Sequence, residues 1–271
     1  TRKEPSEALL DPRDWRLPGP NTREQIAWSE RMEPIDIAAY QHIVVLTGAG
    51  ISVASGLQAY RGPGGVWTKG GDESLATVEG FERDPAASWS LFGPLRAAAR
   101  DAAPNAAHIA LAAAETRAPG TMTTITQNID GLHSRAGSST VIEVHGRANV
   151  SRCSRGECTL PPFDDDSFQE GAVPKCEVCG SPLRPDIVFF NEAIPVQREW
   201  AVKKALREVD LFIAIGTSGT VSPASNYVRS ADYTGARTIY ANLEPMTPPN
   251  PYFQEQYLGA AAELVPNLFA T

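Results

Sequence analysis

Residues 42–67 read HIVVLTGAGISVASGLQAYRGPGGVW, and this stretch decides the fold of the chain. Its apolar run, Ile43–Leu46, is too short for a helix and rich in β-branched residues, so it predicts a buried strand. The turn Gly48-Ala49-Gly50 follows directly, and Ser52 or Ser55 can cap or line a turn of helix after it. A strand, a glycine turn and a helix start favour a dinucleotide pyrophosphate site, although an ordinary βα turn fits two glycines equally well.

A glycine-rich loop continues the same stretch. Arg61 precedes Gly62-Pro63-Gly64-Gly65, and Trp67 follows two residues later. A flexible loop that carries one arginine and one tryptophan suggests a lid over a bound cofactor. The alternative is a solvated surface loop with a tryptophan anchor, which is what loops of this composition often are.

Strands and helices alternate along the rest of the chain. Further strands are predicted at 122–126, 141–144, 211–215 and 237–241, and helices at 85–100, 104–116, 198–208, 223–231 and 260–269. This alternation predicts an α/β fold with a parallel sheet covered by helices on both faces. His108, on the 104–116 helix, is expected to be a structural residue.

The domain organisation follows from changes in composition. Residues 1–34 are expected to be an arm or lead-in, with a short helix that Asn21 or Thr22 caps and that runs to about Glu33. Residues 35–271 are expected to form one domain, interrupted by a small module at about 150–196 that holds all four cysteines. The acidic run Asp164-Asp165-Asp166 in this module is expected to be a solvated loop tip.

Composition excludes several classes of function. The 271-residue chain carries a net charge of −8 and has a pI near 5.1, which argues against direct nucleic-acid binding through a broad basic surface. No apolar run approaches the ~20 residues of a membrane span, and no signal peptide is visible. We therefore expect a cytoplasmic protein without a membrane association. A monomer is one oligomeric state that the sequence allows.

The four cysteines form two short-spaced pairs, Cys153-x4-Cys158 and Cys176-x2-Cys179. Two thiolate pairs about twenty residues apart supply the four ligands that tetrahedral Zn²⁺ needs. Four thiolates leave no open position for water or substrate, so a structural zinc is expected. Redox use of Cys176 and Cys179 is the alternative.

Two further segments carry chemistry. TQNIDGLH, residues 126–133, follows the second strong strand, where open α/β sheets bind ligands. Asn128 can hold a ribose hydroxyl or an ordered water, and Asp130 can accept from a carboxamide, although both residue types are common in βα turns. His145 follows the strand at 141–144 and suits a general base, against the alternative of a satisfied structural histidine.

These motifs together resemble the sirtuins, the NAD-dependent protein-lysine deacylases. GAGISVASGLQAYRG is similar to the signature GAGxSxxSGIPDFRG, QNID is identical to the family motif, EVHG is similar to ELHG, and RPDIVFFNE is similar to RPxVVxFGE. GTS at 216–218 and NLEP at 242–245 complete the series in family order. The chain departs from the signature at Gln58, Ala59 and Tyr60, where the family usually has Pro, Asp or Thr, and Phe.

The resemblance implies a Rossmann-like doubly wound parallel sheet with an inserted zinc-binding module. It implies His145 as the catalytic base, with Asn128 and Arg61 beside it and His133 in support. The residues implied for NAD binding are Gly48, Ala49, Gly50, Ser52, Tyr60, Arg61, Trp67, Gln127, Asn128, Asp130, Gly216, Thr217, Ser218, Asn242, Leu243, Glu244 and Ala261. Those implied for the acyl-lysine substrate are Ile187, Val188, Phe190, Asn191 and Glu192.

The implied reaction is NAD-dependent deacylation of protein lysines. The acyl oxygen attacks the ribose C1′ and releases nicotinamide, His145 deprotonates a ribose hydroxyl, and the products are lysine and O-acyl-ADP-ribose. An ADP-ribosyltransferase or NAD glycohydrolase on the same fold is the alternative, and a non-catalytic NAD sensor is a third. The hydroxyl of Tyr60 is expected to divert part of the reaction to NAD hydrolysis.

Acyl preference can be read from one helix. Relatives that remove succinyl or malonyl groups resemble one another in a Tyr-x-x-Arg pair, and the matching positions here are Phe92 and Leu95. Arg96 is one position late, about 100° round a helix, and is expected to point away unless Pro94 distorts the helix. Neutral acyl groups are therefore expected to be preferred over succinyl.

Overall fold

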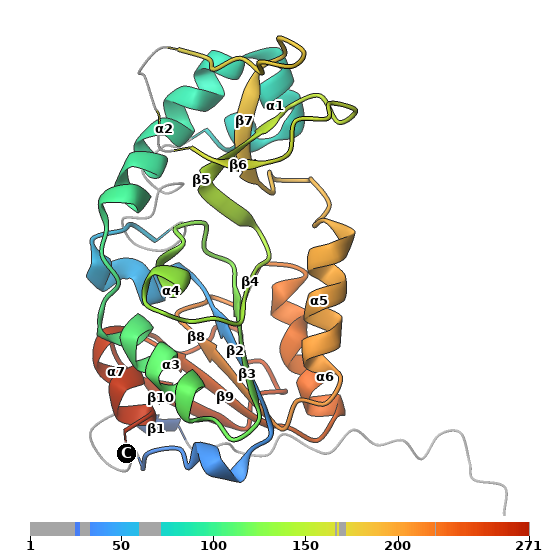
Figure 1. Ribbon diagram of the computed structural model, residues 1–271. Helices are drawn as coiled ribbons and strands as arrows, with labels where there is room; N and C mark the ends of the chain where they lie inside the picture. The colour runs from blue at the N-terminus through green and yellow to red at the C-terminus, as the bar shows by residue number, and fades with distance from the viewer. Residues whose placement is uncertain are drawn as a thin grey trace, which may run out of the picture.

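The computed structural model describes residues 25–27, 33–59, 72–165, 167, 172–219 and 221–270. Within these residues, a parallel sheet of seven strands forms the centre of the larger unit (Figure 1). Its strands, in spatial order, are β1 (Gln25–Ala27), β10 (Glu255–Leu258), β9 (Arg237–Asn242), β8 (Leu211–Ile215), β2 (His42–Thr47), β3 (Thr121–Thr126) and β4 (Val141–Glu143). The predicted α/β fold with a parallel sheet is confirmed.

Helices cover both faces of this sheet, because alternate residues of β2 point to opposite sides. Ile43 and Val45 pack in one apolar cluster with α3 (Ala106–Arg117) and α7 (Ala261–Leu268). Val44 and Leu46 pack in a second cluster on the other side, together with residues of the helices α5 (Val196–Leu206) and α6 (Tyr227–Tyr233). The remaining short helices are η1 (Ile37–Ala39), η2 (Ala49–Ser55), η3 (Glu73–Ala76), α4 (Leu132–Arg135) and η4 (Ala224–Asn226).

A smaller unit stands above the carboxyl ends of the strands in Figure 1. It contains an antiparallel sheet in the order β6 (Phe163–Asp164), β5 (Gly146–Cys153) and β7 (Leu183–Ile187). Two helices from an earlier part of the chain, α1 (Val78–Arg83) and α2 (Pro85–Asp101), join it. Trp89 of α2 donates its indole N–H to the carbonyl of Leu183 at 2.9 Å. The small unit is therefore built from two separate segments, of which the sequence indicated only the second.

A buried ion pair fastens α2 to this unit. Arg96 is 2% exposed, and its guanidinium lies 2.9 Å from the carboxylate of Asp165 and 3.0 Å from the hydroxyl of Ser151. It also donates to the backbone carbonyl of Asp165. The expectation that Asp165 belongs to a solvated loop tip is wrong, because this carboxylate compensates a buried cation. Pro94 lies inside a continuous α2.

Most predicted elements are present with their ends shifted by at most two residues. The helix expected up to Glu33 is wrong where it can be tested, because Gln25–Ala27 is a strand that pairs in parallel with β10. Its proposed caps, Asn21 and Thr22, lie outside the described residues. Gly48 precedes the 3-10 helix η2 without a side-chain cap, so neither Ser52 nor Ser55 caps it.

Candidate active site

The site lies at the point where the strand order of the sheet reverses. From β2 the chain proceeds through β3 to β4 on one side, whereas β8, β9 and β10 lie on the other side of β2. The loops that follow β2 and β8 leave adjacent parallel strands at the same edge of the sheet. Such a switch point is where open α/β sheets bind ligands.

Three glycines lock these two loops together. Gly48 donates its N–H to the carbonyl of Ile215 at 3.0 Å, and Gly50 donates to the carbonyl of Gly216 at 2.9 Å. A Cβ on Gly50 would lie 2.8 Å from the Cα of Gly216, and Gly216 itself has a φ of +60°. The glycines are thus required for loop-to-loop packing, in addition to any approach of the backbone to phosphate.

A buried polar cluster lies beneath the glycine turn. The amide of Asn128 donates to the carbonyl of Gly48 and to the hydroxyl of Ser52, each at 3.1 Å. Ser52 in turn donates to Asp130 at 2.8 Å. The carbonyl oxygen of the Asn128 side chain is buried and has no hydrogen-bond partner among the described residues. Since buried acceptors are normally satisfied, this atom indicates a place for a ligand hydroxyl or a water.

Two buried histidines extend the cluster. His133 lies 2.9 Å from the hydroxyl of Thr47, and its ring packs edge-on against His108 at 4.9 Å. Burial lowers the pKa of His133 to about 3 and that of His108 to about 4, so both are neutral at physiological pH. The structural role expected for His108 agrees with its position, but its contact with the site through Ser52 at 3.5 Å was not foreseen.

His145 stands between the two units of the structure. It follows β4 and immediately precedes β5, and its Nδ1 lies 2.9 Å from the carbonyl oxygen of Gln127. Gln127 also donates its side-chain amide to Thr217 at 2.9 Å, which ties the loops after β3 and β8 together. Burial lowers the pKa of His145 below its usual value of 6.5, so the ring is neutral and able to accept a proton.

Asn128, Gln127 and His145 border one cavity of about 960 Å³. The residues expected to bind the cofactor that line it are Gly48, Ala49, Gly50, Gln127, Asn128, Gly216, Thr217, Ser218, Asn242, Leu243, Glu244 and Ala261. The residues expected to bind the substrate that line it are Ile187, Val188, Phe190, Asn191 and Glu192. His145 lines the cavity where these two sets meet.

Five expected site residues do not line the cavity or cannot be placed. Ser52 and Asp130 are absent from its lining, because they form the hydrogen-bonded layer behind Asn128. Tyr60, Arg61 and Trp67 lie outside the described residues.

The segment after β7 forms a second part of the cavity wall, apart from the glycine turns. Val188 donates its N–H to the carbonyl of His145 at 2.9 Å, and Phe190 donates to Ala76 at 2.8 Å. Asn191 has a φ of +62°, the left-handed conformation that asparagine tolerates where the sirtuin motif has glycine. Glu192 is fixed by Arg184 at 2.7 Å. The wall is therefore rigidly held on both units.

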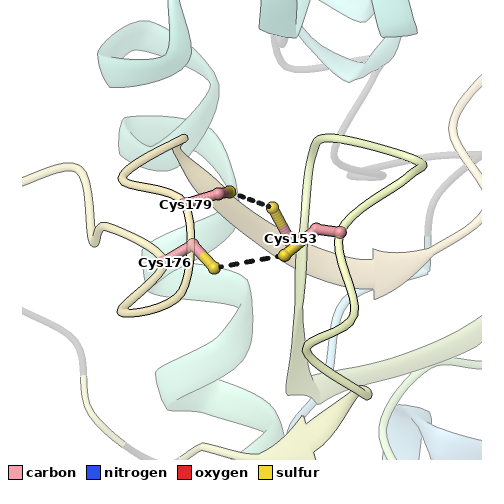
Figure 2. A group of neighbouring side chains, drawn as sticks. Cys153, Cys176 and Cys179 are labelled. Atoms are coloured by element: carbon pink, nitrogen blue, oxygen red, sulfur yellow. Dashed lines mark hydrogen bonds between the residues drawn. The ribbon is translucent and has the colours of Figure 1, made fainter.

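The four cysteines form a metal site of the expected kind. Their sulfur atoms all lie within 4.8 Å of one another, and no disulfide joins them (Figure 2). Cys153 faces Cys179 at 3.5 Å between sulfurs, and Cys158 faces Cys176 at 3.6 Å. Zinc–sulfur bonds of about 2.3 Å give a tetrahedron with edges of about 3.8 Å. The arrangement therefore fits Zn²⁺ bound by four thiolates.

The helices of the described residues include none that is both long and apolar enough to cross a membrane.

Comparison with known proteins gives consistent results. The profile of the Sir2 family matches residues 48–223. An NAD-dependent protein deacylase of Vibrio parahaemolyticus is 42% identical over 231 residues, which cover 84% of this chain and 94% of that protein. NAD-dependent protein deacylase 2 of Pyrobaculum aerophilum is 42% identical over 236 residues, which cover 86% and 91%.

Solved structures agree with the sequence comparison. A Sir2 homolog–NAD complex matches with a TM-score of 0.79 at 33% identity, covering 89% of this chain and 95% of that one. A Sir2–p53 peptide–NAD⁺ complex matches with a TM-score of 0.71 at 29% identity, covering 84% and 92%.

Proposed function

This chain belongs to the Sir2 family, and we propose that it is an NAD-dependent protein-lysine deacylase. It transfers the acyl group of a modified lysine to ADP-ribose and releases nicotinamide. The observation that carries the proposal is the position of His145, a neutral histidine at the junction of a glycine-turn wall and a substrate-type wall in one cavity.

The described residues fit NAD. The glycine turns after β2 and β8 present backbone at the switch point, and the unpartnered oxygen of Asn128 is available to a ribose hydroxyl. Asn242 and Glu244, at and just beyond the end of β9, suit the hydroxyls of the adenosine ribose. When bound, NAD supplies an activated ribose carbon and the hydroxyl that accepts the acyl group.

The role of His145 is to accept a proton. A carbonyl oxygen can only accept, so the contact with Gln127 holds the proton of the neutral ring on Nδ1 and leaves Nε2 as the base. Nε2 belongs to a ring that lines the cavity, where it would accept the proton of a ribose hydroxyl of bound NAD. Gln127, His145 and the Asn128 amide are each held by hydrogen bonds to the protein, which limits the reorganisation that the reaction needs.

The acyl group is proposed to be neutral. Phe92 lines the cavity and stacks on Phe189 with ring centroids 5.2 Å apart, whereas Arg96 is held away from it by Asp165. Among the described residues no arginine or lysine lines the cavity. Among these lining residues a succinyl carboxylate would therefore meet no cationic partner, and burying it unpaired costs several kcal/mol.

The proposed partners are proteins that carry acyl-lysine, presented to the cavity as an extended segment along Val188–Glu192. The proposed location is the cytoplasm, where a reducing environment keeps the four cysteines free of disulfides and available to the metal.

Mass spectrometry of an acetyl-lysine peptide incubated with and without NAD tests the proposal. We expect the peptide to lose one acetyl group only when NAD is present. Addition of ADP-ribose to the peptide, or release of nicotinamide from NAD with the peptide unchanged, would replace deacylation by the transferase or glycohydrolase alternative.

A further inference from the structure

A cluster of five charged side chains lies behind the substrate-type wall. Asp186 binds Arg198 at 2.7 Å and Arg152 at 3.3 Å, and Glu192 binds Arg152 at 2.9 Å and Arg184 at 2.7 Å. Three arginines thus share two carboxylates, which leaves the cluster with a net charge of +1. Arg152, Asp186, Glu192 and Arg198 line a second hollow of about 480 Å³.

Arg198 is the member of this cluster that lies against the backbone next to the base. It lies in the first turn of α5, and its Nη1 would be 3.1 Å from a Cβ placed on Gly146, the residue after His145. The same glycine pairs with Ile187 of β7, next to Asp186. The guanidinium is therefore packed directly against the backbone beside His145, with Asp186 holding it there.

The charge of Arg198 is poorly screened at this position. Its side chain is 25% exposed and that of Asp186 is 19% exposed, so neither is fully solvated. Because Asp186 is shared with Arg152, it does not fully neutralise Arg198. A partly buried cation next to an imidazole opposes protonation of that imidazole.

We infer that Arg198 is a positioning residue of the active site, whose clamped charge adds to burial in keeping the imidazole of His145 in its neutral, proton-accepting form. The inference rests on the proposed role of His145 as the base. Arg198 acts through His145 and does not line the main cavity.

The other charged groups around the cavity do not offset the charge of Arg198. Glu192, Glu199 and Glu244 line the same cavity as His145, and Glu143 and Arg147 flank it on β4 and β5. Glu143 and Arg147 neutralise each other at 3.0 Å, Glu192 is paired with two arginines, and Glu199 lies 3.5 Å from Lys203. Glu244 is exposed, so solvent screens its charge. The pKa of His145 is lowered first by burial, and the charge of Arg198 lowers it further, while the contact with Gln127 opposes both.

The test is a titration of the histidine rings by ¹⁵N NMR, which does not depend on activity. The chain has four histidines, and the His145 signal is assigned by its loss in His145→Ala. In Arg198→Gln we expect the midpoint of His145 to rise by about half a pH unit towards its usual value. Arg198→Met, which keeps the aliphatic stem, should show the same rise, and it serves as the second neutral variant if Arg198→Gln folds poorly.

Two controls separate charge from packing. Arg198→Lys keeps the cation and should keep the wild-type midpoint. Arg152→Gln removes the other guanidinium from Asp186 but leaves Arg198 in place, and it should raise the His145 midpoint less than Arg198→Gln does, because Arg152 lies towards the other end of β5 and pairs there with Arg184.

The acid limb of kcat/KM for deacetylation should move upward with the NMR midpoint in Arg198→Gln. An unchanged or lower His145 midpoint in both neutral variants, or a midpoint in Arg198→Lys equal to that of Arg198→Gln, would overturn the inference. An inactive wild-type protein with the expected NMR shifts would contradict the proposed function and leave the electrostatic coupling intact.

Discussion

The Nδ1 atom of His145 lies 2.9 Å from the carbonyl oxygen of Gln127, which fixes both the orientation and the tautomer of the ring. Gln127 follows β3 and donates its side-chain amide to Thr217 beyond β8, so the position of the base is fixed relative to the centre of the parallel sheet. His145 itself precedes β5 of the small unit. The contact therefore ties the base to both units that form the cavity.

Replacing His145 by alanine should lower deacetylation about 10²- to 10⁴-fold, because the proton acceptor is lost. The affinity for NAD should change little, because the ring does not support the glycine turns. Turnover is measured with an acetyl-lysine peptide and NAD affinity by calorimetry. Near-normal turnover would show that another group is the base.

Replacing Gly50 by alanine should weaken NAD binding and lower the free energy of unfolding by about 1–3 kcal/mol. The new Cβ would lie 2.8 Å from the Cα and the carbonyl oxygen of Gly216, both backbone atoms, so the two loops must separate. The matched control is Gly156→Ala, where no atom lies within 4 Å of the new Cβ. Equal behaviour of the two variants would argue against the loop-to-loop lock.

The buried histidines should make the fold sensitive to acid. The pKa of His108 is lowered to about 4 and that of His133 to about 3, mainly by burial, whereas both return to about 6.5 in the unfolded chain. Below pH 6.5 the unfolded state therefore binds protons that the folded state excludes. The free energy of unfolding is therefore at its full value above that pH and declines as the pH falls, by about 2 kcal/mol for each histidine between pH 7 and pH 5.

Urea unfolding of His108→Gln at pH 7 and pH 5 measures this effect. The variant should lose less stability on acidification than the wild type. The control is His42→Gln, because the side chain of His42 is 41% exposed at the start of β2. This variant should lose as much stability on acidification as the wild type. An unchanged loss in His108→Gln would refute the assignment.

Zinc should be bound tightly and should contribute to folding without taking part in the reaction. Replacing Cys176 by alanine removes one of four thiolates and should lower stability and solubility broadly, because metal binding is part of the folding energy. Elemental analysis of protein purified without chelators should find one zinc per chain. Protein that is folded, active and free of zinc would contradict the site.

Acetyl-lysine should be a better substrate than succinyl-lysine, measured as kcat/KM. Leu95→Arg combined with Phe92→Tyr should improve succinyl-lysine relative to acetyl-lysine, because the pair can bind the acyl carboxylate. Arg96→Gln is the comparison, since Arg96 is bound to Asp165 and its loss should affect stability without changing the preference. Succinyl-lysine as the better substrate of the wild type would overturn the assignment.

The sequence predicted the sheet and the glycine turn because their signals are local. Apolar runs such as Leu211–Ile215 mark central strands wherever they occur, and the glycines follow at once. The sequence did not predict β1, because three residues are too few to show a hydrophobic periodicity and their partner strand β10 lies more than 200 residues later. The helical spacing around Ile26 was a local signal that this pairing overrode.

The small unit was only half visible in the sequence for the same reason. The cysteine spacing marks the segment after β5, but nothing local to α2 shows that Trp89 binds Leu183 or that Arg96 binds Asp165. The same holds for the site, where the motifs located His145 and Asn128. The layer of His108 and His133 behind them arises from tertiary packing.

The cavity is proposed to couple lysine deacylation to cleavage of NAD, and the stoichiometry of one reaction measures this coupling. Nicotinamide, deacetylated peptide and O-acetyl-ADP-ribose are quantified together over time with purified wild-type protein. The account predicts that the three products form in equal amounts and that His145→Ala forms almost none of the last two. Deacetylated peptide that accumulates without O-acetyl-ADP-ribose, or with free acetate in its place, would contradict it.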